Sequence, residues 1–325
     1  MRNVKVLQYQ PSDKHLWDSF VLDSNQQTFL FQRGFMDYHS DRFSDFSLMI
    51  YMDDKLIALL PANKVGNELH SHQGLTYGGI ICNFRLKSEE VIVIFKAILQ
   101  FLNQSKIEKL HIKELPFIYL DSPINNPFSY LYFKVSAQLY RMDMHSVVKP
   151  TSLNYSRSRK NGIKRAEKHD LIVEETDDFS AFWNEILIPN LDNKHDVKPV
   201  HSLDEIQLLK SRFPQQIRQF NVLHEGKIVA GTTIFDTKNV AHSQYISGNK
   251  DKNTLGSLDF LHRFLLQNVF ADKSYFNFGI SHLEQGQLIN EGLMYWKEGF
   301  GAHSVTQGFY TIDTNKHGLL EDIFV

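Results

Sequence analysis

The chain has 325 residues, of which 42% are hydrophobic and 22% are charged, and its formal net charge is −2. This length predicts about two domains with sizeable cores, and the near-neutral charge excludes a generally polybasic nucleic-acid binder, although not a local basic patch. The single cysteine, Cys82, excludes an intramolecular disulfide framework.

The sequence contains no segment that resembles a membrane anchor. Its first ten residues lack the apolar stretch of a signal peptide, and the densest apolar segment, residues 91–102, is interrupted by Lys96 and Gln100. Because a bilayer span needs roughly 18 consecutive apolar residues, we expect no membrane-spanning segment. We therefore expect a cytoplasmic protein.

The first half of the chain predicts a helix, a hairpin, a strand, a helix and a last strand. A helix-like stretch contains Trp17, and the hairpin has strands at 46–52 and 55–64 around the turn Asp53-Asp54. A further strand is expected at 75–81, an amphipathic helix at 88–104 and a closing strand at 109–113. This order predicts a mixed sheet with helices packed on it.

The second half repeats this order. Lys227-Ile-Val-Ala230 matches Lys55-Leu-Ile-Ala58, and His242-Ser243 matches His70-Ser71, since 227 − 55 and 242 − 70 both equal 172. The expected elements are strands at 220–224 and 227–236, a strand at 241–247, a helix at 257–270 and a strand at 275–278. We infer an internal duplication, with the boundary near Pro150 and domains at 1–150 and 151–325.

Two stretches of the second half resemble a known family. They are Arg157-Ser-Arg-Lys-Asn-Gly-Ile-Lys-Arg-Ala-Glu-Lys168 with Leu171-Ile-Val-Glu-Glu175, and Phe276-Asn-Phe-Gly-Ile-Ser281 with Gly292-Leu-Met-Tyr-Trp-Lys-Glu-Gly-Phe-Gly301. With the order of elements, they resemble the GNAT acyltransferase unit, duplicated as in FemAB-type aminoacyl and acyl transferases. The resemblance implies an α/β fold of two tandem GNAT-like units, each a mixed, largely antiparallel sheet with flanking helices. The first copy has Asn83-Phe-Arg-Leu-Lys-Ser88 where GNAT enzymes bind the pyrophosphate of their donor, so we infer that the second unit is active and the first is a scaffold or substrate wall.

The resemblance also implies a place for the donor. GNAT enzymes hold the pyrophosphate of coenzyme A on a Gln/Arg-x-x-Gly-x-Gly/Ala loop before a helix, where this chain departs from the pattern with Asp251-Lys-Asn-Thr-Leu-Gly-Ser257. Gly256 and Ser257 still open a helix whose N–H groups suit an anion. The residues expected to bind an acyl-CoA cofactor are Asn253, Thr254, Gly256 and Ser257.

Acyl transfer to an amine needs a proton acceptor, a donor to the developing oxyanion and firm positioning of both substrates. The expected catalytic residues are Tyr245 as a proton donor, Glu284 or His282 as a base, and Lys297 beside an oxyanion or phosphate. Tyr245 equally fits a core aromatic residue. Strand alternation predicts His242 and Gln244 on one face and Tyr245 on the other.

Substrate contacts are expected from the basic stretch and from polar strand residues. This group comprises Arg157, Arg159, Lys164, His242, Gln244, Asn277 and Ser281. A solvated helix is the alternative for the basic stretch, and a structural role is the alternative for His242. No metal site is expected, because the closest histidine pair, His70 and His72, has no second pair nearby and no HExxH or CxxC motif occurs.

These expectations lead to three hypotheses about function. The first is an N-acyltransferase that moves an acyl group from acyl-CoA to an amine of a sugar, sugar-nucleotide or cell-envelope precursor by direct attack. The second is an aminoacyl-tRNA-dependent transferase of the FemAB type, with tRNA as a partner. The third is a non-catalytic binding protein on the same fold. The acceptor and the oligomeric state stay open.

Overall fold

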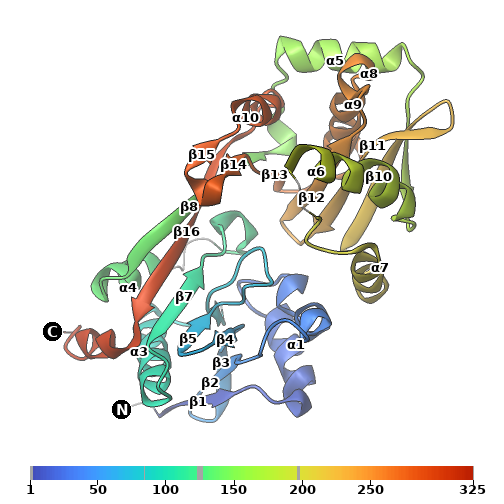
Figure 1. Ribbon diagram of the computed structural model, residues 1–325. Coiled ribbons are helices and arrows are strands. Elements are labelled where there is room, and N and C mark those ends of the chain that lie inside the picture. The colour runs from blue at the N-terminus through green and yellow to red at the C-terminus, as the bar shows by residue number, and fades with distance from the viewer. Residues whose placement is uncertain (1–2, 84, 123–126, 196–197, 325) are drawn as a thin grey trace. The chain divides into compact units, whose positions relative to one another are not determined.

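The computed structural model describes residues 3–83, 85–122, 127–195 and 198–324 (Figure 1). The chain divides into two compact units, Met1–Asp143 with Thr306–Val325, and Met144–Val305. This division differs from the predicted boundary at residue 150, because the C-terminal segment belongs to the first unit. The long strands β8 (Gln138–Val148) and β16 (His303–Asp313) contribute residues to both units, which the periodicity of the sequence does not indicate.

The first unit contains two groups of strands. An antiparallel sheet has the order β1 (Val4–Gln8), β2 (Leu48–Met52), β3 (Lys55–Leu60) and β6 (Ile81–Cys82). The second group has the order β4 (Asn63–Val65), β5 (Glu68–His70), β7 (Lys109–Lys113) and β16. Helices α1 (Lys14–Leu22), α2 (Arg33–Met36), α3 (Ser88–Gln104) and α4 (Phe128–Lys134) complete the unit.

Local sequence explains most of the first unit. Asp53 and Asp54 have φ angles of 48° and 62°, as a tight hairpin turn between twisted strands requires, so the predicted hairpin is confirmed. Helix α3 has the predicted bounds and buries the face that carries Val91, Phe95 and Ile98. None of the described helices has the length and apolar character that a bilayer crossing requires.

The strand predicted at 75–81 is wrong, because only Ile81 of that segment lies in a strand. Its apolar residues are buried, but in loop conformation. A Cβ atom at Gly78 would lie 1.9 Å from the carbonyl oxygen of Ser71, so the two backbones are in contact there. The apolar residues of segment 75–81 are therefore buried as part of a loop and not as part of a strand.

The second unit contains a large group of paired strands covered on both faces, and a two-stranded hairpin of β14 (His282–Leu283) and β15 (Leu288–Ile289). Strands β9 (Ile172–Thr176), β10 (Ile217–His224), β11 (Lys227–Asp236) and β12 (Val240–Gly248) are antiparallel, and β13 (Tyr275–Ile280) lies between β12 and β8. Helices α5 (Arg157–Glu167), α8 (Lys252–Leu255) and α9 (Ser257–Phe264) lie on one face (Figure 1). The π-helix η6 (Phe182–Leu187) and α6 (Ile188–His195) lie on the other, and α7 (Leu203–Arg212) contacts β10.

The two units repeat one arrangement. The first contains the parallel pair β5–β7, in which His70 faces His111, and the second contains the parallel pair β12–β13, in which His242 faces Asn277. Trp17 and Trp183 are fully buried, and each indole N–H donates to a backbone carbonyl. The predicted duplication is therefore confirmed at the level of strand pairing.

Candidate functional site

Strands β12 and β13 separate after a short parallel pairing. They pair only from Val240 to His242 on β12 and from Tyr275 to Asn277 on β13, in the described part of the chain. Beyond that point β12 continues to Gly248, with a bulge at Gln244, and the pairing of β13 with β8 is irregular. Bulges bend strands, so the two strands diverge and leave backbone donors and acceptors for a ligand.

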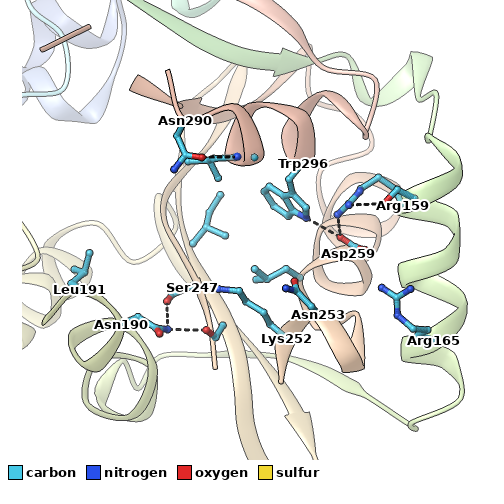
Figure 2. A pocket seen from close by; sticks show the side chains of 16 residues that line it. Arg159, Arg165, Asn190, Leu191, Ser247, Lys252, Asn253, Asp259, Asn290 and Trp296 are labelled. Atoms are coloured by element: carbon cyan, nitrogen blue, oxygen red, sulfur yellow. Dashed lines mark hydrogen bonds and ion pairs between the residues drawn. The ribbon is translucent and has the colours of Figure 1, made fainter. Parts of the chain in front are cut away.

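A cavity of about 820 Å³ lies along the free part of β12 (Figure 2). Its volume is in the range of small-molecule pockets. Its walls combine cationic, amide and apolar groups. The lining residues are Ser158, Arg159, Arg165, Asn190, Leu191, Ile246, Ser247, Gly248, Lys252, Asn253, Leu258, Asp259, Asn290, Gly292, Leu293 and Trp296.

One wall is held by a buried carboxylate. Asp259, in the first turn of α9, accepts hydrogen bonds from the Arg159 guanidinium and from Trp296 Nε1, the latter at 2.9 Å (Figure 2). Burial raises the pKa of Asp259, while the charge of Arg159 and the indole donor oppose that effect. The carboxylate thus connects α5, α9 and α10 (Glu291–Glu298), which form this wall.

The start of α9 is covered by α5. A Cβ atom at Gly256, where φ is +69°, would lie 2.1 Å from the carbonyl oxygen of Gly162, and one at Gly162 would lie 1.7 Å from Asp259 Oδ2. Ser257 is fully buried. Of the residues expected to bind acyl-CoA, only Asn253 lines the cavity; Gly256 and Ser257 are packed beneath α5, and Thr254 is exposed.

The opposite wall is formed by the end of β12 and helix α6. Asn190 Nδ2 donates to Ser247 Oγ and to the carbonyl oxygen of Gly248, both at 2.8 Å (Figure 2). The side-chain amide therefore binds the last residues of β12, which face the cavity without a partner strand on that side in the described structure.

Lys297 lies in helix α10, directly after Trp296, and its side chain contacts the end of β13. Its Nζ donates to the carbonyl oxygens of Gly279 at 3.1 Å and Ile280 at 2.6 Å, and only 2% of the residue is exposed. Burial lowers the pKa of Lys297 to about 7. A neutral amine has two N–H groups, which these carbonyls satisfy, and one lone pair, so the group is suited to accept a proton near neutral pH.

Buried polar side chains surround the point at which the strands separate. Asn277 Oδ1 accepts from Gly279 N at 2.8 Å, and Asn277 Nδ2 lies 3.3 Å from His145 Nδ1. The rings of His145 and His242 are 6.5 Å apart, and burial, followed by the charges of His145 and Lys297, lowers the pKa of His242 to about 3. We call His145, His242, Asn277 and Lys297 the β13 cluster.

The structure therefore brings three predicted site residues, His242, Asn277 and Lys297, into one cluster. Within the cluster, His242 Nδ1 has no hydrogen-bond partner among the described residues, and neither has Oγ of the buried Ser281; both atoms suit a ligand. The signal for Lys297 was its aromatic and glycine-rich context. His145, by contrast, was missed, because it lies in a strand without a recognisable motif.

The predicted faces of β12 are wrong. Thr233 faces Tyr245 and Ile234 faces Ser243, so Gln244 is the extra residue of a bulge and alternation is interrupted there. Tyr245 therefore lies on the η6 side, where its ring packs against Trp183. Its hydroxyl accepts from His201 N at 3.1 Å and lies 2.6 Å from His201 Nδ1.

The remaining predicted residues are distributed around the site. Arg159 lines the cavity, whereas Arg157 and Lys164 are exposed on α5. His282 Nδ1 accepts from Met144 N at 3.3 Å, and Glu284 is exposed in the turn that follows β14 (His282–Leu283). Sequence reasoning missed several lining residues, because their meeting depends on helix packing: Asn190, Asp259, Asn290 and Trp296.

Comparison with known proteins identifies the fold. The sequence matches no protein-family model, and no curated protein matches it. The structure of FemX superposes with a TM-score of 0.68 at 10% identity, over 96% of this chain and 98% of FemX. The C-terminal domain of a protein named a lysylphosphatidylglycerol synthetase, from Agrobacterium fabrum, gives 0.57 at 13%, over 95% and 93%. A tandem GNAT protein from the clavulanic acid biosynthesis pathway gives 0.51 at 10%, over 96% and 99%.

These identities are low and the coverage is nearly complete, so the likeness concerns the fold. The chain has a GNAT-like fold in the duplicated, FemAB-type arrangement, which confirms the predicted fold class.

Proposed function

We propose that the chain is a transferase whose second unit binds an aminoacyl-tRNA in the cavity along β12 and passes the aminoacyl group to an amine. The observation that carries the proposal is the divergence of β12 and β13 beside a cavity whose expected pyrophosphate site, at Gly256 and Ser257, is covered by α5. A GNAT-like fold with this closed helix start favours a donor other than coenzyme A.

The charge distribution supports a nucleic-acid donor. Helix α5 presents exposed cations beside the cavity, and one of them, Arg165, also lines it. Cations placed along such a face bind phosphates, while an aromatic ring such as that of Trp296 provides a surface on which a base stacks. The exposed cations of α5 are Arg157, Lys160, Lys164 and Arg165, followed by Lys168.

We place the transfer step beside the β13 cluster, because Lys297 directly follows Trp296 of the cavity wall in helix α10. In the proposed step, the acceptor nitrogen forms a bond to the ester carbonyl carbon, and the bond from that carbon to the ribose oxygen of tRNA breaks. The acceptor nitrogen loses a proton and the ribose oxygen gains one. Lys297, whose pKa is about 7, exchanges protons at this pH, and Asn277 holds the bend of β13 through Gly279.

Donor binding tests the proposal. We expect an aminoacyl-tRNA to bind with an affinity that falls steeply as salt rises, because cations of α5 contact its phosphates. Arg165→Ala is expected to weaken binding and to reduce the salt dependence. Lys227→Ala is the matched control, since Lys227 is an exposed cation of the same unit at the β10–β11 turn.

Thermal unfolding with acetyl-CoA, longer acyl-CoAs and free CoA provides the opposing test. A ligand at about 100 times its dissociation constant stabilises the folded state by roughly 2.7 kcal/mol, so a CoA site would raise the melting temperature clearly. We expect no rise. A rise with one thioester, together with no binding of aminoacyl-tRNA, would replace this proposal with an acyl-CoA-dependent transferase.

A further inference from the structure

The first unit carries a group of potential metal ligands at the position that corresponds to the β13 cluster. His70 of β5 faces His111 of β7 in parallel pairing, just as His242 faces Asn277 in the second unit. Glu68 precedes His70 by two residues and so lies on the same face, where the second unit has Val240. The first unit thus has a second imidazole, His111, where the second unit has Asn277, and a carboxylate, Glu68, where it has Val240.

The three side chains lie within reach of one ion. One ligand atom of each, from Glu68, His70 and His111, lies within 4.8 Å of the other two. His111 Nε2 is 2.9 Å from Glu68 Oε2, and the rings of His70 and His111 are stacked 4.5 Å apart. Tetrahedral zinc places its ligand atoms roughly 3.3 Å apart, so small side-chain rotations close the group around an ion.

The sheet presents the three side chains on the face that points away from the core. Leu69 and Leu110 point into the core, so the three polar side chains occupy the other, half-buried face of the sheet.

A second contact orients one of the imidazoles. Thr311 of β16 faces His111, and its Oγ1 lies 3.0 Å from His111 Nδ1. A hydrogen bond at one ring nitrogen of a ligating histidine determines which nitrogen binds the metal and how the ring is turned. Here it directs Nε2 toward Glu68 and His70.

We propose that Glu68, His70 and His111 bind a zinc ion that links β5 to β7 in the first unit. Zinc forms bonds to a Glu68 oxygen and to one nitrogen of each imidazole, and water takes the fourth position. His111 Nε2 gives up the proton that it shares with Glu68, which passes to solvent, while Nδ1–H donates to Thr311. The proposal does not depend on the function proposed for the second unit.

Zinc titration of the tag-free 325-residue chain by calorimetry tests the site. We expect one zinc per chain and a higher melting temperature with zinc. Glu68→Gln, His70→Ala and His111→Ala are each expected to weaken binding at least tenfold, whereas His15→Ala, at an exposed histidine of α1, leaves it unchanged. Circular dichroism checks that each variant is folded. If a histidine variant does not fold, the Glu68→Gln variant still tests the site.

Two further variants separate a built site from casual binding to histidines. Thr311→Val is expected to weaken zinc binding about 10-fold to 100-fold, because it removes the contact that orients His111. Lys109→Met is expected to strengthen it, because Lys109 Nζ lies 3.8 Å from Glu68 Oε1 and competes for the carboxylate. Absence of zinc binding at 100 times the protein concentration, or equal affinity in the wild type and the Glu68 and His70 variants, would overturn the proposal.

Discussion

The amine of Lys297 lies 2.6 Å from the carbonyl oxygen of Ile280, at the end of β13 where the sheet has opened. Because burial lowers the pKa of Lys297 to about 7, we expect the turnover rate to rise with pH through about 7 and then to level off, as the neutral amine becomes available. Lys297→Arg keeps a permanent positive charge and should remove the rise together with most of the activity. A turnover rate that falls above pH 7 would instead show that the protonated amine of Lys297 is the active form.

The same shift predicts how stability depends on pH. The folded state holds the Lys297 pKa near 7, well below its ordinary value of 10.5, so between these values the unfolded chain binds a proton that the folded chain does not. Stability contributed by this group is therefore lost as pH falls from about 10.5 to about 7. As pH falls through this window, the wild type should lose stability relative to Lys297→Met, by the order of a few kcal/mol in unfolding free energy. Below about pH 7 the difference between the two proteins should stay constant. Urea denaturation across the window measures it; a constant difference would contradict the shifted pKa.

The contact between Gly162 and Asp259 predicts a destabilising substitution. Alanine at Gly162 improves helix propensity by up to about 1 kcal/mol, but its Cβ atom would lie 1.7 Å from Asp259 Oδ2, so either the carboxylate leaves Arg159 and Trp296 or helices α5 and α9 separate. We expect a net loss of about 1–3 kcal/mol in urea denaturation. Gly292→Ala, in helix α10 with the nearest atom 3.7 Å away, is the matched control and should be neutral or stabilising. Equal effects would mean that the two helices do not pack this closely.

Tyr245 distinguishes a structural hydroxyl from a catalytic one. Its hydroxyl accepts a hydrogen bond from His201 N and is hydrogen-bonded to His201 Nδ1. Tyr245→Phe removes both of these contacts with the buried His201 and should therefore cost about 1–3 kcal/mol of stability. The turnover rate of the folded variant should change less than threefold. A loss of 100-fold or more with unchanged stability would return Tyr245 to the role of proton donor that its position in the sequence suggested.

Local patterns predicted the repeating elements well. The turns at Asp53-Asp54 and Glu225-Gly226 adopt the positive φ angles that two-residue hairpins require, and α3 begins and ends where its periodicity predicts. The helix predicted at 257–270 consists of α9 followed by a π-helical turn, Leu265–Val269. These features depend on residues close in sequence, which explains why they can be predicted from it.

The geometry of the site depends on contacts between distant residues. The bulge at Gln244 reverses the face of Tyr245, and only the pairing with β11 reveals it. Asn161 and Gly162 have low helix propensity, but both lie in α5. The missing side chain at Gly162 leaves room there for Asp259 of α9. The cavity wall of Asp259 and Trp296 results from the same packing, and no motif in either segment indicates it.

The most direct test of donor binding uses a stable 3′-aminoacylamino analogue of the tRNA terminus and two tryptophan variants. Leu293 lines the cavity and is 38% exposed, whereas Leu208 of α7 is 41% exposed and is not among the residues that line it. If the donor occupies the cavity, Leu293→Trp fills part of it and should weaken binding of the analogue at least tenfold, while Leu208→Trp leaves the affinity unchanged. Equal affinity of both variants and the wild type would place the donor elsewhere and contradict the proposed site.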